Sequence, residues 1–186
     1  MEPKGYTEEL IRVLKGLDHA PITALANMIK EAKERGATVY VFGNGGSGAA
    51  SSHLSEDLGK MTTPDFVDHK GRLRILSLTD NTPYILCLAN DLGYDQVFSQ
   101  QLMNLARAGD IAIGISGSGN SKNVIVALEK AKAMGLTTVG ILGYDGGRIK
   151  GMVDLSIHVR SFDMQICEDV HMHVIHQLVK LLMVDH

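Results

Sequence analysis

Two stretches of this 186-residue sequence carry side chains that can transfer protons or bind a metal ion. His53 and Asp57 are one helical turn apart in a segment with helical character, so both side chains share a face. That arrangement suits two ligands of a metal ion or a coupled acid–base pair. The second stretch combines acids with histidines in an apolar setting: Glu168, Asp169, His171, His173 and His176. Three histidines exceed what core packing requires, and we expect His173 and one other to face solvent.

A glycine-rich loop at 43–48, Gly-Asn-Gly-Gly-Ser-Gly, lies between an apolar run and the helical segment that carries His53. Glycines let the backbone turn with positive φ, and the free N–H groups at the start of the next helix favour an anion. The loop lacks the lysine of a P-loop and the spacing of a dinucleotide-binding fingerprint. It is therefore either part of a ligand site or a structural tight turn.

A second loop at 116–121, Ser-Gly-Ser-Gly-Asn-Ser, also joins an apolar run to a helical segment. Its three hydroxyls can surround a phosphate with neutral donors, and Ser121 can also cap the helix that follows. Capping requires one serine, so three serines favour a phosphate site. The turn at 143–147, Gly-Tyr-Asp-Gly-Gly, has no hydroxyl cluster, and we interpret it as an ordinary turn.

The loops alternate with the elements of an α/β fold. Short apolar and β-branched runs predict five strands, separated by helix-length segments, at 38–42, 73–78, 111–115, 137–142 and 153–159. This alternation predicts a parallel sheet covered on both faces, with ligands at the carboxyl ends of its strands. Helical spacing further predicts an N-terminal helical hairpin, a helix in the middle of the chain and a long last helix, at 7–36, 122–134 and 164–183. The segment 61–71 is expected to be a surface loop.

Composition narrows the class of protein. A chain of this length fits one domain, residues 1–186, without disulfides or a structural metal. The net charge of −3 gives no basic field for nucleic acid, and no apolar run approaches membrane-spanning length. Cys87 and Cys167 lack metal-type spacing, and we expect both to fill the core as reduced thiols. These features predict a cytoplasmic protein that binds neither nucleic acid nor membranes and needs no organic cofactor.

The order of the motifs resembles that of SIS (sugar isomerase) domains, and specifically the phosphoheptose isomerase family. The elements that carry the resemblance are the two loops, Thr79-Asp80, Asp145-Gly146-Gly147 and Val174-Ile175-His176, spread over nearly the whole chain. The resemblance implies a three-layer fold in which a parallel five-stranded sheet is flanked by helices. It also implies a homotetramer with active sites at subunit interfaces. We expect residues 1–36 to take part in that assembly.

The resemblance assigns roles to particular positions. His176 matches the family's catalytic histidine, Asp57 its catalytic glutamate and His53 a partner of both. In the family these positions, with a glutamine on the last helix, can hold one zinc ion per subunit. Glu168 stands where that glutamine is expected, so the predicted metal ligands are His53, Asp57, Glu168 and His176. Glu168 and His176 are about 12 Å apart along a regular helix, so one ion must lie between them to bind both.

The alignment of the last helix and several substitutions leave the chemistry open. Gln165 and His173 have the same mutual spacing as Glu168 and His176, although the flanking residues favour the second pair. Asp57 is one methylene shorter than the family's glutamate and Glu168 adds a charge. Gly117 replaces a threonine in the second loop, and Ile166 replaces an arginine.

The predicted reaction is aldose–ketose isomerisation of sedoheptulose 7-phosphate to D-glycero-D-manno-heptose 7-phosphate through an enediol(ate). His176 and Asp57 form the acid–base pair. The residues expected to bind substrate are Asn44, Gly45, Ser47, Asp80, Ser116, Gly117, Ser118, Asn120, Ser121 and Glu168, with the phosphate on the second loop. Two alternatives remain at this point. One is a non-catalytic SIS protein that regulates a protein partner, of the replication-initiator-associating type, and the other is an isomerase of a different sugar phosphate.

Overall fold

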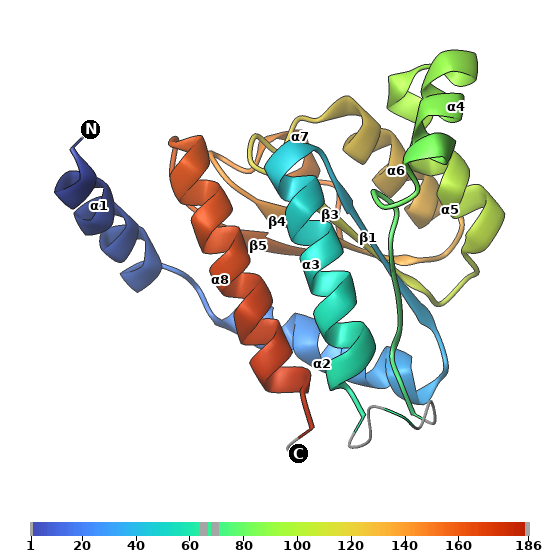
Figure 1. Ribbon diagram of the computed structural model, residues 1–186, viewed down its shortest axis with the longest axis horizontal. Helices are drawn as coiled ribbons and strands as arrows, with labels where there is room; N and C mark the ends of the chain where they lie inside the picture. The colour runs from blue at the N-terminus through green and yellow to red at the C-terminus, as the bar shows by residue number, and fades with distance from the viewer. Residues whose placement is uncertain (1, 64–66, 68–70, 185–186) are drawn as a thin grey trace.

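The fold is built around one parallel sheet, whose strands lie behind the helices in Figure 1. The computed structural model describes residues 2–63, 67 and 71–184. Its five strands run in the order β2-β1-β3-β4-β5, and every neighbouring pair is parallel. The strands are β1 (Thr38–Gly43), β2 (Arg74–Ser77), β3 (Ile111–Ser116), β4 (Thr137–Leu142) and β5 (Leu155–His158). The predicted five-stranded sheet is confirmed, with ends that differ by no more than two residues.

Side chains of β1 alternate between two cores, one on each face of the sheet. Val39 and Val41 join the core under α3 (Gly45–Met61) and α8 (Met164–Leu182), whereas Tyr40 and Phe42 join the core under the helices of the other face. Because a parallel strand is covered on both faces, nearly all of its residues are apolar, as the sequence shows. This arrangement gives the three layers that the resemblance implied.

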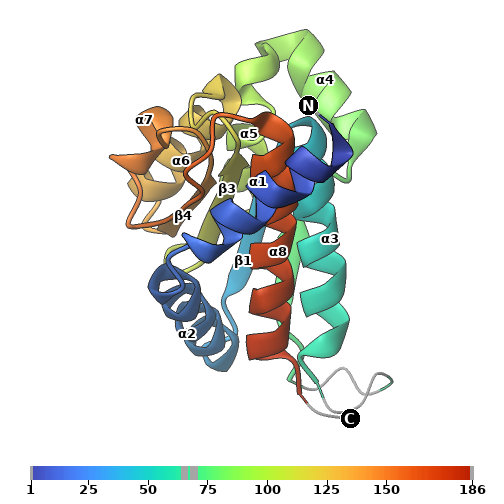
Figure 2. The same cartoon turned by 90° about the vertical axis from the view of Figure 1, so that its left-hand side faces the viewer.

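The first face is covered by four helices of the described ranges, of which α3 and α8 lie side by side in front of the sheet in Figure 1. The four helices are α1 (Pro3–Lys15), α2 (Ala20–Glu34), α3 (Gly45–Met61) and α8 (Met164–Leu182). The second face carries α4 (Thr82–Leu92), the 3₁₀ turn η1 (Tyr94–Gln96), α5 (Ser99–Leu105), α6 (Lys122–Ala133) and α7 (Gly147–Lys150). The N-terminal helical pair is present, and both of its helices pack on α8. Figure 2 shows α1 crossing α8.

Strand order places the ligand edge of the sheet. The chain passes from β1 outward to β2 and then returns to β3 on the other side of β1. In open α/β sheets, ligands bind at the carboxyl ends of the two strands where the direction of winding reverses. Here these strands are β1 and β3, and the loops that follow them are the two glycine-rich loops. Both loops therefore flank the crevice where a ligand is expected.

The two cysteines and the loop at 61–71 differ in how far the structure tests them. Cys167 is buried as predicted, but Cys87 is exposed on α4, so the prediction that it fills the core is wrong; both thiols are free. The predicted loop at 61–71 begins at the last residue of α3, and its residues 64–66 and 68–70 lie outside the described part of the chain. None of the helices in the described ranges combines the length and apolar character needed to cross a membrane.

Candidate active site

The first loop connects β1 directly to α3. Gly45 has φ +53°, a left-handed conformation that glycine adopts without steric cost, and α3 starts at this residue. Asn44 and Gly45 line a cavity of about 300 Å³, while the buried Ser47 lines a second cavity of about 310 Å³. The helix dipole and the first N–H groups of α3 thus face the space in which a ligand would lie.

Two of the three hydroxyls of the second loop, those of Ser116 and Ser121, contact each other. Ser116 Oγ lies 3.1 Å from Ser121 Oγ and accepts a hydrogen bond from the backbone N–H of Gly119 at 3.1 Å. Ser121 is the N-cap residue of α6, but its side chain makes no capping hydrogen bond. The alternative that these serines serve only to cap the helix therefore has no support, and their hydroxyls remain near the helix N-terminus as donors for an anion.

The third turn, interpreted from sequence as ordinary, supports the second loop. Arg148 donates its backbone N–H to Asn120 Oδ1 at 3.0 Å, and Asn120 Nδ2 donates to the carbonyl of Ser118 at 3.0 Å. Ile149 donates its backbone N–H to the carbonyl of Gly119 at 3.0 Å. Both functional groups of the Asn120 amide therefore shape the loop. This role was not visible in the sequence because the two segments are 28 residues apart.

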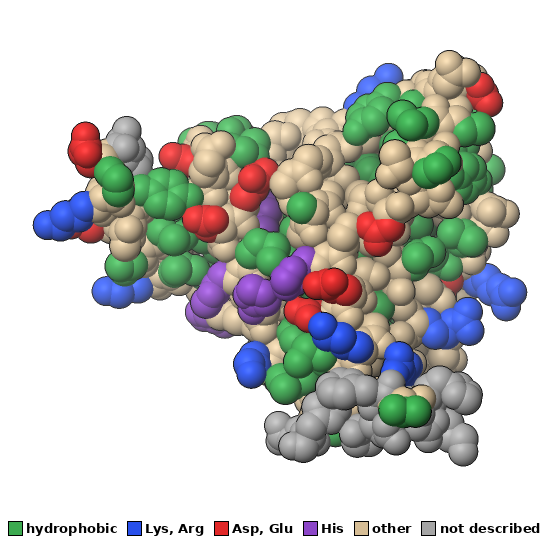
Figure 3. All heavy atoms as spheres, viewed as in Figure 1, with side chains coloured by type: hydrophobic (Ala, Val, Ile, Leu, Met, Phe, Trp, Pro, Cys, Tyr) green, Lys and Arg blue, Asp and Glu red, His purple; other side chains and the backbone are tan. Residues whose placement is uncertain are grey.

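Three of the predicted ligand residues converge between α3 and α8. His53 Nε2 lies 3.3 Å from Asp57 Oδ2 and 3.2 Å from His176 Nε2. Each of the three offers a ligand atom within 4.8 Å of the other two. These separations match neighbouring ligands of a tetrahedral ion with bonds of about 2.0–2.2 Å. Figure 3 shows the histidines gathered on this face beside acidic side chains.

The surroundings of this cluster mix charge with exposure. The side chain of Asp57 is 16% exposed and that of His53 is 38% exposed, so water and ligands can reach the group. Lys60 Nζ lies 3.6 Å from Asp57 Oδ1. Glu56 Oε1 lies 3.8 Å from Nδ1 of His53, on the ring edge opposite the cluster, as expected of a residue that points elsewhere.

Glu168, the fourth predicted ligand, lies apart from this cluster. Its carboxylate sits against Gly46 at the N-terminus of α3, where a Cβ on Gly46 would be 2.5 Å from both oxygens. It also lines the 310 Å³ cavity together with Ser47 and His53. The separation of eight residues along α8 explains the difference, because Glu168 is more than two turns from His176. The prediction of Glu168 as a ligand stays a prediction.

The positions of two histidines on α8 support one of the two possible alignments. Both are exposed, but His176 contacts His53, whereas Nε2 of His173 lies 2.8 Å from Nε2 of Gln177. Gln165, the other member of the rejected pair, is exposed at the start of α8. The pair Glu168 and His176 therefore faces α3, as the flanking residues indicated.

A polar group beside the first loop contains a residue that the sequence analysis missed. Ser52, two turns into α3, donates its hydroxyl to Asp80, and its Oγ lies 3.1 Å from Thr79 Oγ1. Asp80 follows β2, so this contact joins the carboxyl end of β2 to α3. Its position directly before His53 on an exposed helix face was the only available signal. Asp80 is thereby held at the edge of the same crevice.

Gly117 has a physical explanation. A Cβ at this position would lie 2.3 Å from the sulfur of Met164, the first residue of α8. Met164 thus fills the space that the threonine of the family would require. Met164 can occupy this space only because residue 117 is a glycine without a side chain.

Two of the three histidines on α8, His173 and His176, are exposed, as expected, whereas only 1% of the surface of His171 is exposed. Neither ring nitrogen has a hydrogen-bond partner of good geometry among the described residues. Burial lowers the pKa of His171 to about 4, and interaction with the Leu142 carbonyl offsets part of that effect. His171 is therefore neutral in the folded protein, at the base of the 310 Å³ cavity.

This burial predicts acid sensitivity. Between pH 6.5 and about 4 the unfolded chain binds a proton at His171 and the folded chain does not, so stability falls as the pH falls. The loss over this range is about 3 kcal/mol. Denaturant unfolding of wild type and His171→Leu at several pH values measures it. The acid-dependent loss should shrink in His171→Leu and persist in His173→Ala; equal slopes in all three proteins would contradict the prediction.

Comparison with known proteins agrees with this site. The family model of the SIS domain matches residues 5–143. A "Probable phosphoheptose isomerase" of Thermoplasma acidophilum is 39% identical over 182 residues, 98% of each chain. A phosphoheptose isomerase of Pelobacter propionicus is 38% identical over 166 residues, 89% of this chain and 86% of that one. The structure of phosphoheptose isomerase GmhA from Neisseria gonorrhoeae has a TM-score of 0.88 and 29% identity, covering 96% of this chain and 95% of that one. The chain thus belongs to the SIS domain family and, within it, to the phosphoheptose isomerases, which are aldose–ketose isomerases.

Proposed function

We propose that this protein interconverts sedoheptulose 7-phosphate and D-glycero-D-manno-heptose 7-phosphate. The observation that carries the proposal is the convergence of His53, Asp57 and His176 in a protein whose two glycine-rich loops lie at the switch point of the sheet. His53 links the two features, because it also lines the 310 Å³ cavity with Gly46 and Ser47 of the first loop. An acid–base group and a phosphate site are what isomerisation of a sugar phosphate requires. The names of the relatives support the choice of a phosphorylated heptose.

The two loops differ in the part of the substrate that suits them. The carboxylate of Glu168 already lies at the N-terminus of α3, so a second anion beside it would be repelled. The second loop offers Ser116, Ser118 and Ser121 at the start of α6 without such a carboxylate in contact. We therefore assign the phosphate to the second loop and the sugar hydroxyls to Asn44, Gly45, Ser47, Asp80 and Glu168.

Asp57 and His176 supply the proton transfers. Asp57, as a carboxylate, removes a proton from C1 of the ketose. Its side chain is 16% exposed, so this proton exchanges with water before Asp57 delivers a proton to C2 of the enediol(ate). His176 carries the second proton, which passes from the C1 hydroxyl to the C2 oxygen. Substrate and product then contain the same atoms and no redox partner is needed. The shorter Asp57 requires the sugar to approach α3 closely. The 310 Å³ cavity lined by His53 and Ser47 offers space beside the same helix.

The residues of this site also fit a zinc ion. His53 Nε2, Asp57 Oδ2 and His176 Nε2 are spaced as neighbouring ligands, and the Glu168 carboxylate could reach the ion only by rotating away from Gly46. A zinc ion bound there would polarise the substrate carbonyl and stabilise negative charge on oxygen. One zinc per subunit is part of the proposal, and the protein needs no organic cofactor for this chemistry.

A cytoplasmic homotetramer completes the proposal. The N-terminal helix α1 projects from the body of the subunit in Figure 1, and its Ile11 is 46% exposed. Such a helix offers apolar surface to a neighbouring subunit, which supports a role of residues 1–36 in assembly. The free thiols Cys87 and Cys167 are consistent with a reducing compartment.

The alternatives are separated by a direct assay. Zinc-supplied protein is incubated with sedoheptulose 7-phosphate, and NMR of the sugar monitors the aldose product. Fructose 6-phosphate serves as the competing sugar phosphate. We expect conversion of the heptose at a higher kcat/KM than that of the hexose. Preference for the hexose would identify an isomerase of another sugar, and binding without conversion of either would indicate a non-catalytic protein.

A further inference from the structure

The side chain of Asn44, in the first loop, is held by two residues from other parts of the chain. Asn44 Oδ1 accepts hydrogen bonds from Asn123 Nδ2 at 2.8 Å and from the Tyr94 hydroxyl at 3.0 Å. In return, Asn44 Nδ2 donates to Asn123 Oδ1 at 2.9 Å. Asn123 belongs to α6, which follows the second loop, and is only 3% exposed. A paired amide contact thus joins the two ligand loops across the switch point.

A backbone group fixes the orientation of both amides. The N–H of Val124 donates to Asn123 Oδ1 at 3.0 Å, and because this N–H can only donate, the oxygen of Asn123 must face it. The amide nitrogen of Asn123 then faces Asn44, so Asn44 must present its oxygen to it. The Tyr94 hydroxyl, as a donor, agrees with the same orientation.

This orientation limits what Asn44 can offer to a ligand. Both acceptor positions of Asn44 Oδ1 are occupied, and one of the two N–H bonds of Nδ2 is used by Asn123. A single N–H remains, on a side chain that lines the 300 Å³ cavity together with Tyr94. Asn44 can therefore donate to a sugar oxygen and cannot accept from a sugar hydroxyl.

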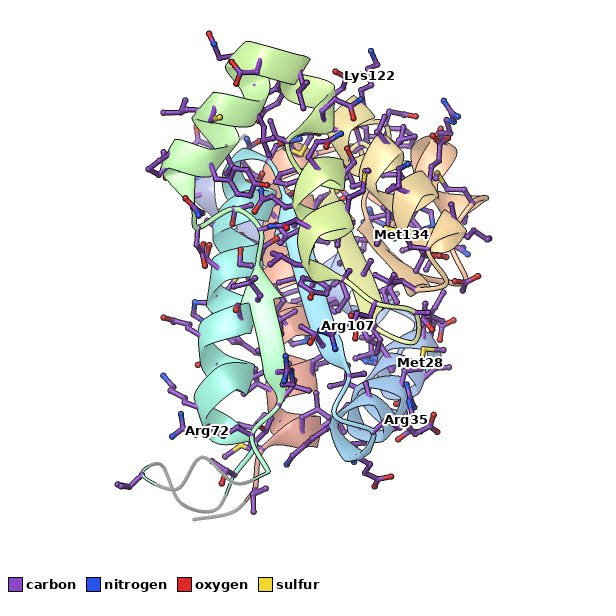
Figure 4. All side chains as sticks on the ribbon, turned by 90° about the vertical axis from the view of Figure 1, so that its right-hand side faces the viewer. Met28, Arg35, Arg72, Arg107, Lys122 and Met134 are labelled. Carbon is purple, nitrogen blue, oxygen red and sulfur yellow. The ribbon has the colours of Figure 1, made fainter. Side chains whose placement is uncertain are left out.

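The segment that carries Tyr94 also contacts α6, the helix that follows the second loop. Asp95, the next residue of η1, forms an ion pair with Lys122 of α6 at 3.1 Å. Lys122 is labelled in Figure 4, where it lies at the end of the molecule that also carries α4. Gly93 precedes η1 with φ +97°, which only glycine adopts readily and which turns the chain from α4 back to the loops. The 3₁₀ turn thus contacts the first loop through Tyr94 and the start of α6 through Asp95.

We propose that Tyr94 and Asn123 are positioning residues that orient the Asn44 amide, so that its free N–H donates to an oxygen of the sugar while the phosphate is held by the second loop. The inference rests on the proposed function for the identity of the ligand. Neither residue touches the atoms that react. Their loss should therefore weaken binding of the sugar and leave proton transfer by Asp57 and His176 nearly unchanged.

Tyr94→Phe tests this with little risk to the fold, because Tyr94 is 58% exposed and only its hydroxyl is removed. We expect KM for sedoheptulose 7-phosphate to rise about fivefold, since one neutral hydrogen bond is lost, while kcat changes by less than about twofold. Inhibition by inorganic phosphate should be unaltered, because the second loop is untouched. Tyr84→Phe, on α4 just before this segment, is the matched control and should behave as wild type.

Asn123→Asp is the stronger variant. The carboxylate still accepts from Val124 but cannot donate to Asn44, so the Asn44 amide loses its defined orientation; KM should rise at least about tenfold.

The proposal is wrong if Tyr94→Phe matches Tyr84→Phe, or if it lowers kcat and weakens phosphate inhibition alongside KM. If wild type does not turn over, the proposed function has failed, and calorimetric binding of sedoheptulose 7-phosphate decides the inference separately. Weaker binding by Tyr94→Phe supports it, and equal binding or no binding by wild type overturns it.

Discussion

Asp57→Asn is expected to reduce kcat for sedoheptulose 7-phosphate by about 10³-fold, because an amide cannot remove a proton from carbon at neutral pH. His176→Ala should cause a loss of similar size, because the second proton then lacks its carrier. The side chain of Asp57 makes only partly exposed contacts with His53 and Lys60, so the melting temperature should change by no more than a few degrees. Steady-state kinetics and thermal unfolding of the purified variants measure both effects.

Two neighbouring residues provide controls of the same type. Glu56 lies beside Asp57 on α3 but approaches the other edge of the His53 ring, so Glu56→Gln should retain activity within a few-fold of wild type. His173 lies one turn before His176 on α8 and is exposed, so His173→Ala should do the same. Zinc content is determined for each protein to separate loss of metal from loss of proton transfer. An Asp57→Asn protein that stays folded and turns over at the wild-type rate would contradict the assignment.

Gly119→Ala should damage the phosphate loop. Gly119 has φ +65°, and a Cβ there would lie 2.0 Å from the carbonyl oxygen of Gly146 and 2.8 Å from the N atom of Gly147. These are backbone atoms of the third turn, which cannot move without breaking the hydrogen bond from Ile149 to Gly119. We expect inhibition by inorganic phosphate to weaken at least about tenfold and unfolding free energy to fall by about 3 kcal/mol.

Gly36→Ala separates backbone strain from the clash. Gly36 has a similar φ of +69°, but a Cβ there meets no atom within 4 Å, so this variant carries only the cost of the left-handed conformation. It should lose about 1 kcal/mol of stability and keep wild-type inhibition by phosphate. If Gly119→Ala and Gly36→Ala were equally stable and equally inhibited, the third turn would not support the loop as described.

The fold was predictable because its signals are local. Continuous apolar strands such as Ile111–Ser116 indicate a sheet covered on both faces, and glycine-rich loops after two of these strands indicate the ligand edge. The pairing of His53 with Asp57 followed from helical spacing alone. Their meeting with His176, 123 residues later, required the family resemblance in addition.

The remaining features depend on tertiary contacts that no local pattern encodes. Asn44 and Asn123 are 79 residues apart. The sequence around each predicts only an ordinary loop residue or helix residue. The burial of His171 among surface-type histidines depends on the orientation of α8. Glu168 was expected at the metal site because of its aligned position. Its carboxylate instead lies against Gly46 at the N-terminus of α3.

Isotope exchange tests the central claim most directly, because it reports the removal of a carbon-bound proton itself. Wild type and Asp57→Asn, both supplied with zinc, are incubated with sedoheptulose 7-phosphate in D₂O, and NMR measures deuterium at C1 of the ketose and C2 of the aldose. The proposed mechanism predicts deuterium at both carbons with wild type and almost none with Asp57→Asn. Conversion of the ketose without any solvent deuterium, or equal incorporation by both proteins, would contradict a solvent-exchangeable proton transfer by Asp57.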